Sequence, residues 1–83
     1  MTTYYFRERS DCGRLYQSAK IEAEDLNNAK KIVMEKIFHD DAYIVIGTDI
    51  DGYTKKIPNI CMLAVRRPKN SYRKFARWTT LNR

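Results

Sequence analysis

The spacing of apolar residues predicts one amphipathic helix near the middle of the chain. Five apolar residues recur at intervals of three and four positions, which is the spacing of one helix face: Leu26, Ala29, Ile32, Val33 and Ile37. Asp25 precedes this stripe and is a good N-cap, because its carboxylate can accept the free amide hydrogen of Asn28. We expect the helix to end near Phe38 and His39.

The segments on either side of this helix have the composition of strands. Thr3–Arg9 is rich in aromatic residues, and Arg14–Ala23 alternates between apolar and polar positions. The cluster Ser10–Gly13 lies between them and predicts a turn, so we expect these two strands to form a hairpin. After the helix, Ala42–Thr48 and Ile60–Arg66 are further strand segments, the first of them rich in β-branched residues.

The segment Tyr72–Leu81 is compatible with two secondary structures. Tyr72, Phe75 and Trp78 are spaced by three residues, which allows a helix. We favour a strand, because Trp78 is followed by two threonines and these residue types prefer extended backbone.

The elements together predict an α+β fold with the order ββαβββ. One antiparallel β-sheet of about five strands would have the α-helix packed on one face, within a single domain that spans 1–83. Asp51 and Gly52 predict a type I′ hairpin turn, since glycine adopts positive φ without steric cost. The expected core includes Leu26, Ile32, Val33, Ile44, Leu63 and Val65.

Charge is distributed asymmetrically along the chain. Residues 1–41 carry seven Lys or Arg and eight Asp or Glu, a net of −1, whereas 42–83 carry nine and two, a net of +7. The segment 66–83 holds seven cations and no carboxylate, with Tyr72, Phe75 and Trp78 between them. Cations bind phosphates by Coulomb attraction and aromatic rings stack on bases, so a polyanion is the expected partner. The alternative is a solubilising surface whose aromatic residues pack in the core.

Residue types suited to catalysis or metal binding are sparse. His39, followed by Asp40 and Asp41, would make an acid–base pair, but we favour the interpretation that this histidine suits the negative end of the helix dipole. Cys12 and Cys61 are the only cysteines, so we expect free thiols and no metal site. A Gly-rich phosphate loop and a long apolar run are both missing. We therefore expect a cytoplasmic binding protein with no catalytic residues, no metal and no cofactor.

Four short motifs together resemble a known family. Residues 21–30 have the form I-E-A-x-x-L-x-x-A-K, and Phe38-His39 follows at the expected end of the helix. Leu63–Arg66 and Arg77-Trp78 lie in the late strands. The chain in this respect resembles small phage anti-CRISPR proteins, and in particular an inhibitor of the type I-F (Csy) surveillance complex. The resemblance covers roughly residues 19–78.

The resemblance implies a function, a partner and a set of contact residues. Such an anti-CRISPR protein binds a crRNA-guided, Cascade-like complex in the host cytoplasm, on the Cas backbone subunits that hold the guide RNA, and blocks target DNA binding. By position, its basic contact residues would be Lys30, Lys31, Lys36, Arg66 and Arg77. The charge pattern adds Arg67, Arg73 and Trp78, and we expect Trp78 to hold Arg77 in place.

Other interpretations of the same residues stay open. A small basic phage or regulatory protein that binds RNA or DNA directly would also carry this basic tail. The helix lysines would equally form a plain solvated surface. A homodimer would help to stabilise so small a core, and no membrane partner is expected. A small ribonuclease that uses His39 is the least favoured interpretation, because that one histidine is its whole support.

Overall fold

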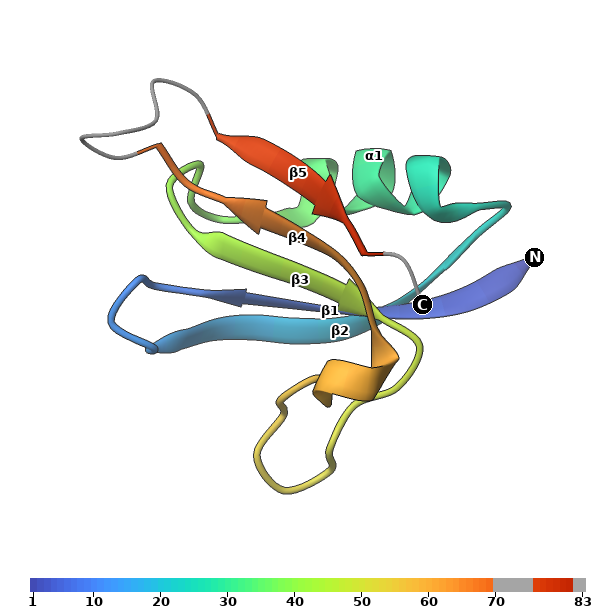
Figure 1. Ribbon diagram of the computed structural model, residues 1–83, viewed down its shortest axis with the longest axis horizontal. Helices are drawn as coiled ribbons and strands as arrows, with labels where there is room; N and C mark the ends of the chain where they lie inside the picture. The colour runs from blue at the N-terminus through green and yellow to red at the C-terminus, as the bar shows by residue number, and fades with distance from the viewer. Residues whose placement is uncertain (70–75, 82–83) are drawn as a thin grey trace.

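In the described part of the chain, five antiparallel strands form one sheet and one α-helix covers one of its faces (Figure 1). The structure is a computed structural model that describes residues 1–69 and 76–81. The strand order across the sheet is β2-β1-β3-β4-β5, and every neighbouring pair is antiparallel. The predicted α+β class and ββαβββ order are confirmed. The elements are β1 (Thr2–Arg9), β2 (Leu15–Ala23), α1 (Leu26–Lys36), β3 (Tyr43–Gly47), the 3-10 turn η1 (Asn59–Cys61), β4 (Met62–Arg67) and β5 (Arg77–Thr80).

The helix begins and ends close to the predicted residues. Asp25 is the N-cap, and its carboxylate accepts the backbone N–H of Asn28 at 2.8 Å. The apolar stripe faces the sheet, with Ala29 and Val33 fully buried along it. Ile37 leaves the helical conformation and still donates its backbone N–H to the carbonyl of Val33 at 3.1 Å.

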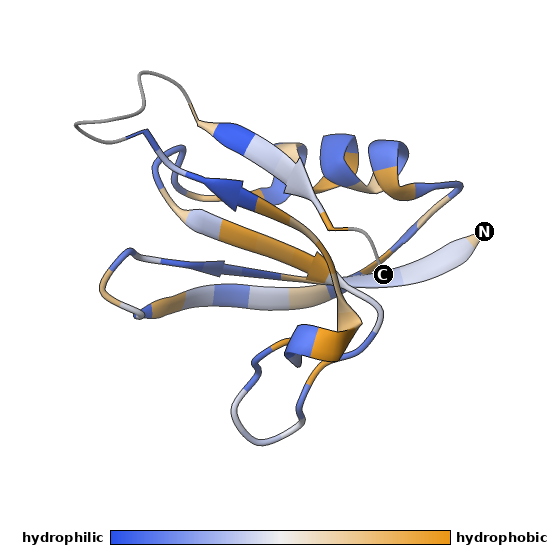
Figure 2. Cartoon of the chain, in the orientation of Figure 1, coloured by the Kyte–Doolittle hydropathy of each residue, from blue (hydrophilic) through white to orange (hydrophobic). Residues whose placement is uncertain are grey.

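The core lies between α1 and the sheet. Side chains alternate along β1, so Phe6 points to the helix and is fully buried beside Ile44 and Ile46 of β3. Figure 2 shows β3 as the most continuously hydrophobic strand. Among the expected core residues, Val33 and Ile44 are fully buried, while Leu26, Ile32 and Leu63 pack partly buried at the edge.

The placement of Val65 in this core was wrong. Val65 pairs with Val45, whereas its neighbour Ala64 pairs with the core residue Ile46. Neighbouring residues in a strand point to opposite faces, so Val65 lies on the side of the sheet away from the helix.

The connection between β3 and β4 is not the predicted type I′ turn. The segment 48–61 is a long connection that ends in η1, and its left-handed residue is Lys55, with φ of 60°, not Gly52. The Asp51 carboxylate accepts the backbone N–H groups of Tyr53 at 2.8 Å and Thr54 at 3.4 Å. These hydrogen bonds stabilise the charged carboxylate and hold the pKa of Asp51 below its usual value.

The final segment is a strand, as predicted, where the structure describes it. β5 covers 77–80 and pairs with β4, while the predicted part from Tyr72 to Phe75 lies outside the described residues. Among the residues described, no helix is long and apolar enough to cross a membrane.

Candidate functional site

The candidate site lies on the face of the sheet opposite α1, which we call the open face. On β1, Phe6 and Glu8 face the helix, so the alternating side chains of Arg7 and Arg9 belong to the open face. Val45 on β3 and Val65 on β4 share this face by their pairing. In the described part of the chain no helix covers this face, which is rich in arginine, although the connection 48–61 covers the part of it around the buried Val45.

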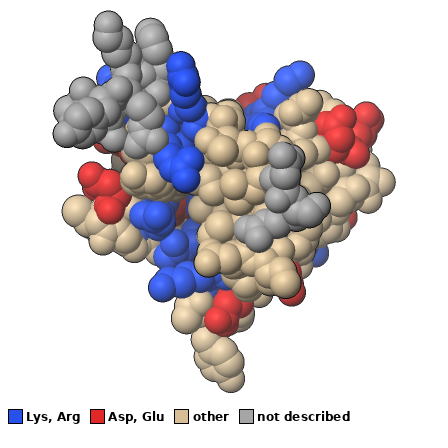
Figure 3. Space-filling view, viewed as in Figure 1, with Lys and Arg blue, Asp and Glu red and all other residues tan. Residues whose placement is uncertain are grey.

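Three arginines and one tyrosine form a row across four strands of the open face. Arg9 pairs with Tyr43, and Arg67 pairs with Arg77. Ile44 of β3 pairs with Arg66 of the antiparallel β4. The next residues beyond this pair, Tyr43 and Arg67, therefore lie opposite one another. We call Arg9, Tyr43, Arg67 and Arg77 the basic row. Figure 3 shows a band of Lys and Arg side chains on the side of the molecule that carries these strands.

The charges of the basic row are not neutralised within the described part of the chain. The one contact found there between a basic and an acidic side chain joins His39 to Glu8, and none of the described Lys or Arg side chains lies within 4.0 Å of a carboxylate. The guanidinium of Arg9 lies 4.5 Å from the ring centre of Tyr43, and Arg67 donates to the hydroxyl of Thr79 at 3.2 Å. Arg67 and Arg77 are directly opposed like charges, an arrangement that destabilises a sheet and that an anion would relieve.

Most of the residues predicted to bind the partner are not on the open face. Trp78 pairs with Arg66 on the helix side of the sheet and packs partly buried against the core. Lys30 extends from α1 to the hydroxyl of Thr80 at 2.8 Å, and its Nζ lies 5.8 Å from the Trp78 ring centre. Arg66 donates to the backbone carbonyl of Asp40 at 3.0 Å. These side chains therefore have structural contacts within the protein.

The remaining predicted residues divide between the two sides of the molecule. Lys31 and Lys36 are exposed on α1, and Arg67 and Arg77 are together on the open face. Arg73 lies outside the described residues. The expectation that Trp78 holds Arg77 in place was wrong, because adjacent residues of β5 point to opposite faces of the sheet.

Three cations of the open face were not singled out from the sequence: Arg7, Arg9 and Lys56. The signal for the two arginines was present, since residues two apart in a strand share a face. They were overlooked because residues 1–41 have a net negative charge, and that count mixes both faces of the sheet. Nothing local in the sequence places Lys56 beside them.

His39 has a different carboxylate partner from the two that follow it in sequence. Its Nδ1 lies 3.5 Å from the fully buried carboxylate of Glu8, and its ring stacks on Tyr16 with ring centres 4.0 Å apart. Glu8 also accepts the backbone N–H groups of Phe38 and His39 and the side-chain amide of Gln17. These bonds fasten the end of α1 to the sheet, which accounts for a buried carboxylate in structural terms.

Comparison with known proteins adds no further evidence to this geometry. The chain matches no family model, no curated protein and no solved structure. The arrangement of charge on the open face, together with the sequence motifs, is therefore the basis for inferring function. Among the residues the structure describes, no three His, Cys, Asp or Glu side chains are grouped so as to hold a metal ion.

Proposed function

We propose that the protein is a phage anti-CRISPR protein that binds a crRNA-guided surveillance complex in the host cytoplasm and blocks target DNA binding. It would act as a non-catalytic inhibitor, with no cofactor. The motif of residues 21–30 and the late Arg77-Trp78 pair support the kind of target. The basic row supports binding through arginine contacts to an anionic surface, and it is the observation that carries the proposal.

The basic row suits a phosphate-rich or carboxylate-rich partner. Arginine presents a planar fork that binds either group through two hydrogen bonds, so it gives orientation as well as charge. Neighbouring strands are about 4.8 Å apart, so a row that crosses four strands spans about 14 Å. In a surveillance complex, such a row would meet the guide RNA or acidic groups of the backbone subunits. An occupant at that place prevents target pairing, because recognition requires both base pairing and backbone contacts.

The two sides of the protein give two testable contact surfaces. We assign the contact to the basic row, because its cations share one face of the sheet and lie in a line across four strands. The resemblance implies Arg77, which belongs to the row, and also the helix lysines and Arg66, which lie on the other side of the sheet. The double variant Arg67→Glu/Arg77→Glu reverses two charges of the row, and Lys31→Glu/Lys36→Glu is its matched control on the exposed surface of α1.

The experiment measures binding of each protein to a purified type I-F surveillance complex and its competition with target DNA. We expect the wild type to bind the complex and to prevent binding of labelled target duplex. The row variant should lose about ten-fold to a hundred-fold in affinity, which corresponds to roughly 1–3 kcal/mol for charge-assisted contacts. The helix variant should bind within about two-fold of the wild type, which is about 0.4 kcal/mol. A loss confined to the helix variant would move the contact to α1.

A small nucleic-acid-binding protein is the second candidate function. The observation that favours it is Tyr43, an aromatic ring between two arginines on an unshielded sheet face, which is an arrangement suited to a single strand or a duplex backbone. Binding to free DNA that falls steeply with salt, and no binding to the surveillance complex, would support this function. A tight complex with weak salt dependence and weak binding to free DNA would support the inhibitor.

A further inference from the structure

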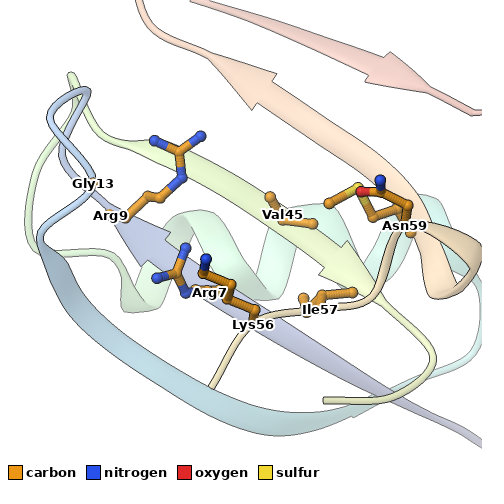
Figure 4. Close-up of a pocket in the computed structure, with 8 residues that line it drawn as sticks. Arg7, Arg9, Gly13, Val45, Lys56, Ile57 and Asn59 are labelled. Atoms are coloured by element: carbon orange, nitrogen blue, oxygen red, sulfur yellow. The ribbon is translucent and has the colours of Figure 1, made fainter. Parts of the chain in front are cut away.

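A pocket of about 370 Å³ lies on the open face, between β1 and the connection 48–61 (Figure 4). Figure 4 shows Arg7 and Arg9 on β1 and Lys56 on the connection, with Val45 and Ile57 to one side of these three cations. The lining residues are Arg7, Arg9, Gly13, Val45, Lys56, Ile57, Asn59 and Met62. Among the residues described, the lining therefore contains three cations, an apolar wall and no carboxylate.

The side of this pocket formed by the connection 48–61 is positioned by close contact of Ile57 and Cys61 with Gly47. A side chain at Gly47 would collide with the side chain of Ile57 and would lie 2.8 Å from the carbonyl oxygen of Cys61. The absence of a side chain lets the connection fold back onto the sheet, where Ile57 is buried and Thr48 donates its N–H to Cys61 at 3.0 Å. Lys56 directly precedes Ile57, so this fold holds it at the pocket.

The electrostatics of the pocket are those of an anion site. The Nε–H of Arg7 is buried and has no hydrogen-bond acceptor in the described structure. Burial, and the charge of Arg9 nearby, lower the pKa of the Arg7 guanidinium. An unpaired buried donor on a charged group costs free energy, and a bound anion would supply both the missing acceptor and the opposing charge.

We propose that this pocket binds a terminal phosphoryl group of a nucleotide, held by Arg7, Arg9 and Lys56 against the apolar wall of Val45, Ile57 and Met62. A terminal phosphate carries close to two negative charges at neutral pH and three acceptor oxygens, which suits three cations better than a single carboxylate does. The volume is within the lower part of the range for small-molecule sites, about 300–1,000 Å³, so the pocket has room for part of the sugar or base. The phosphate would come from a free mononucleotide or from the 5′ end of a strand. The proposal stands independently of the surveillance complex.

Equilibrium binding of AMP, adenosine, inorganic phosphate and a short oligonucleotide with or without a 5′-phosphate tests this proposal. We expect AMP to bind and adenosine to fail at the same concentrations. Preference for the 5′-phosphorylated oligonucleotide over AMP would identify a strand end as the source, and equal or tighter binding of AMP would identify a free nucleotide. Equal binding of AMP and adenosine, or no binding of any phosphorylated probe, would overturn the proposal.

Two pocket variants and one matched control locate the binding. Arg7→Gln should weaken binding of the preferred probe at least ten-fold, and Lys56→Gln should weaken it several-fold. Lys31→Gln removes one positive charge from the exposed surface of α1 and should leave the affinity unchanged. Lys56 is exposed, so Lys56→Gln keeps the test decisive if Arg7→Gln does not fold. An equal loss in Lys31→Gln and Lys56→Gln would show that net charge, not the pocket, controls binding, and would contradict the proposal.

Discussion

The carboxylate of Glu8 accepts the backbone N–H of His39 at 2.7 Å, across the interface between β1 and the end of α1. The N–H of Phe38 donates to the same carboxylate at 2.9 and 3.0 Å. A fully buried Glu8 thus accepts from two backbone amides that follow the helix. The contact links two segments 31 residues apart in sequence.

Replacement of Glu8 by alanine should strongly destabilise the fold. The change leaves the backbone N–H groups of Phe38 and His39 without their acceptor and opens a cavity, so we expect the free energy of unfolding to fall by about 3 kcal/mol. Glu8→Gln keeps the size and one acceptor oxygen and should cost less than the alanine variant. Denaturant unfolding of the three proteins checks this order, and a Glu8→Ala variant with unchanged stability would contradict the anchoring role.

The connection 48–61 should depend on the missing side chain of Gly47. Gly47→Ala would place a methyl group against Ile57 and the carbonyl of Cys61, so we expect a loss of about 1–3 kcal/mol in stability. Gly52→Ala is the matched control, since a side chain there meets open space. Thermal melts of both variants test the prediction. Equal melting temperatures would show that the connection does not need the close approach.

The sequence of β1 predicted a strand, but it did not predict that Glu8 anchors the end of the helix. Tyr4, Phe6 and Glu8 share the buried side of β1, and the charge of Glu8 made that side appear less buried than it is. The acceptor role of Glu8 depends on backbone groups at 38 and 39, and local periodicity contains no information on a contact so distant in sequence. The helix was predicted well because its stripe and cap are local features.

The candidate site was predicted only in part for the same reason. Arg67 was predicted from the basic composition of the late segment, and Arg77 was predicted from the resemblance. That both lie in one row with Arg9 follows only from the order of the strands in the sheet. Asp51 and Gly52 pointed to a tight turn, so the return of Lys56 to the open face was not anticipated. Charge counts along a sequence combine residues that the two faces of a sheet keep apart.

A charge on the buried stripe of α1 should prevent folding. Val33 is fully buried, and an aspartate there would lose its hydration without gaining a partner. We expect the loss to approach the whole stability of a small domain, which is about 5 kcal/mol at the low end of the usual range. Lys31→Asp, two residues earlier on the exposed side, should keep a cooperative melt. A folded Val33→Asp protein, judged by circular dichroism, would show that the helix register is different.

Asp51 should make the connection sensitive to acid. Its folded-state pKa is lowered by the hydrogen bonds from Tyr53 and Thr54, so its contribution to stability is present above the unfolded value near 3.8 and is lost as pH falls through the lower folded value. Asp51→Ala should therefore lower the denaturation midpoint near pH 7, and this difference should shrink as the pH falls from 3.8 to 2. A midpoint difference that stays constant between these pH values would contradict this assignment.

Reversal of the charge of Arg77 should separate stability from binding. Arg77 is directly opposite Arg67, and opposite charges across a strand pair stabilise a sheet, whereas like charges destabilise it. We therefore expect Arg77→Glu to raise the free energy of unfolding by about 0.2–1 kcal/mol. The neutral control Arg77→Gln should give roughly half of that gain.

The same Arg77→Glu protein should bind the proposed polyanionic partner less tightly, because we assign the contact to the basic row, which loses one of its positive charges in this variant. Unfolding curves and binding to the purified surveillance complex and to free duplex DNA, measured on one preparation, check both effects. A variant that gains stability and loses affinity shows that the two opposed arginines, Arg67 and Arg77, lower the stability of the fold but contribute to binding. A loss of both would mean that Arg77 serves the fold, and an affinity unchanged for every partner would remove this arginine from the contact surface.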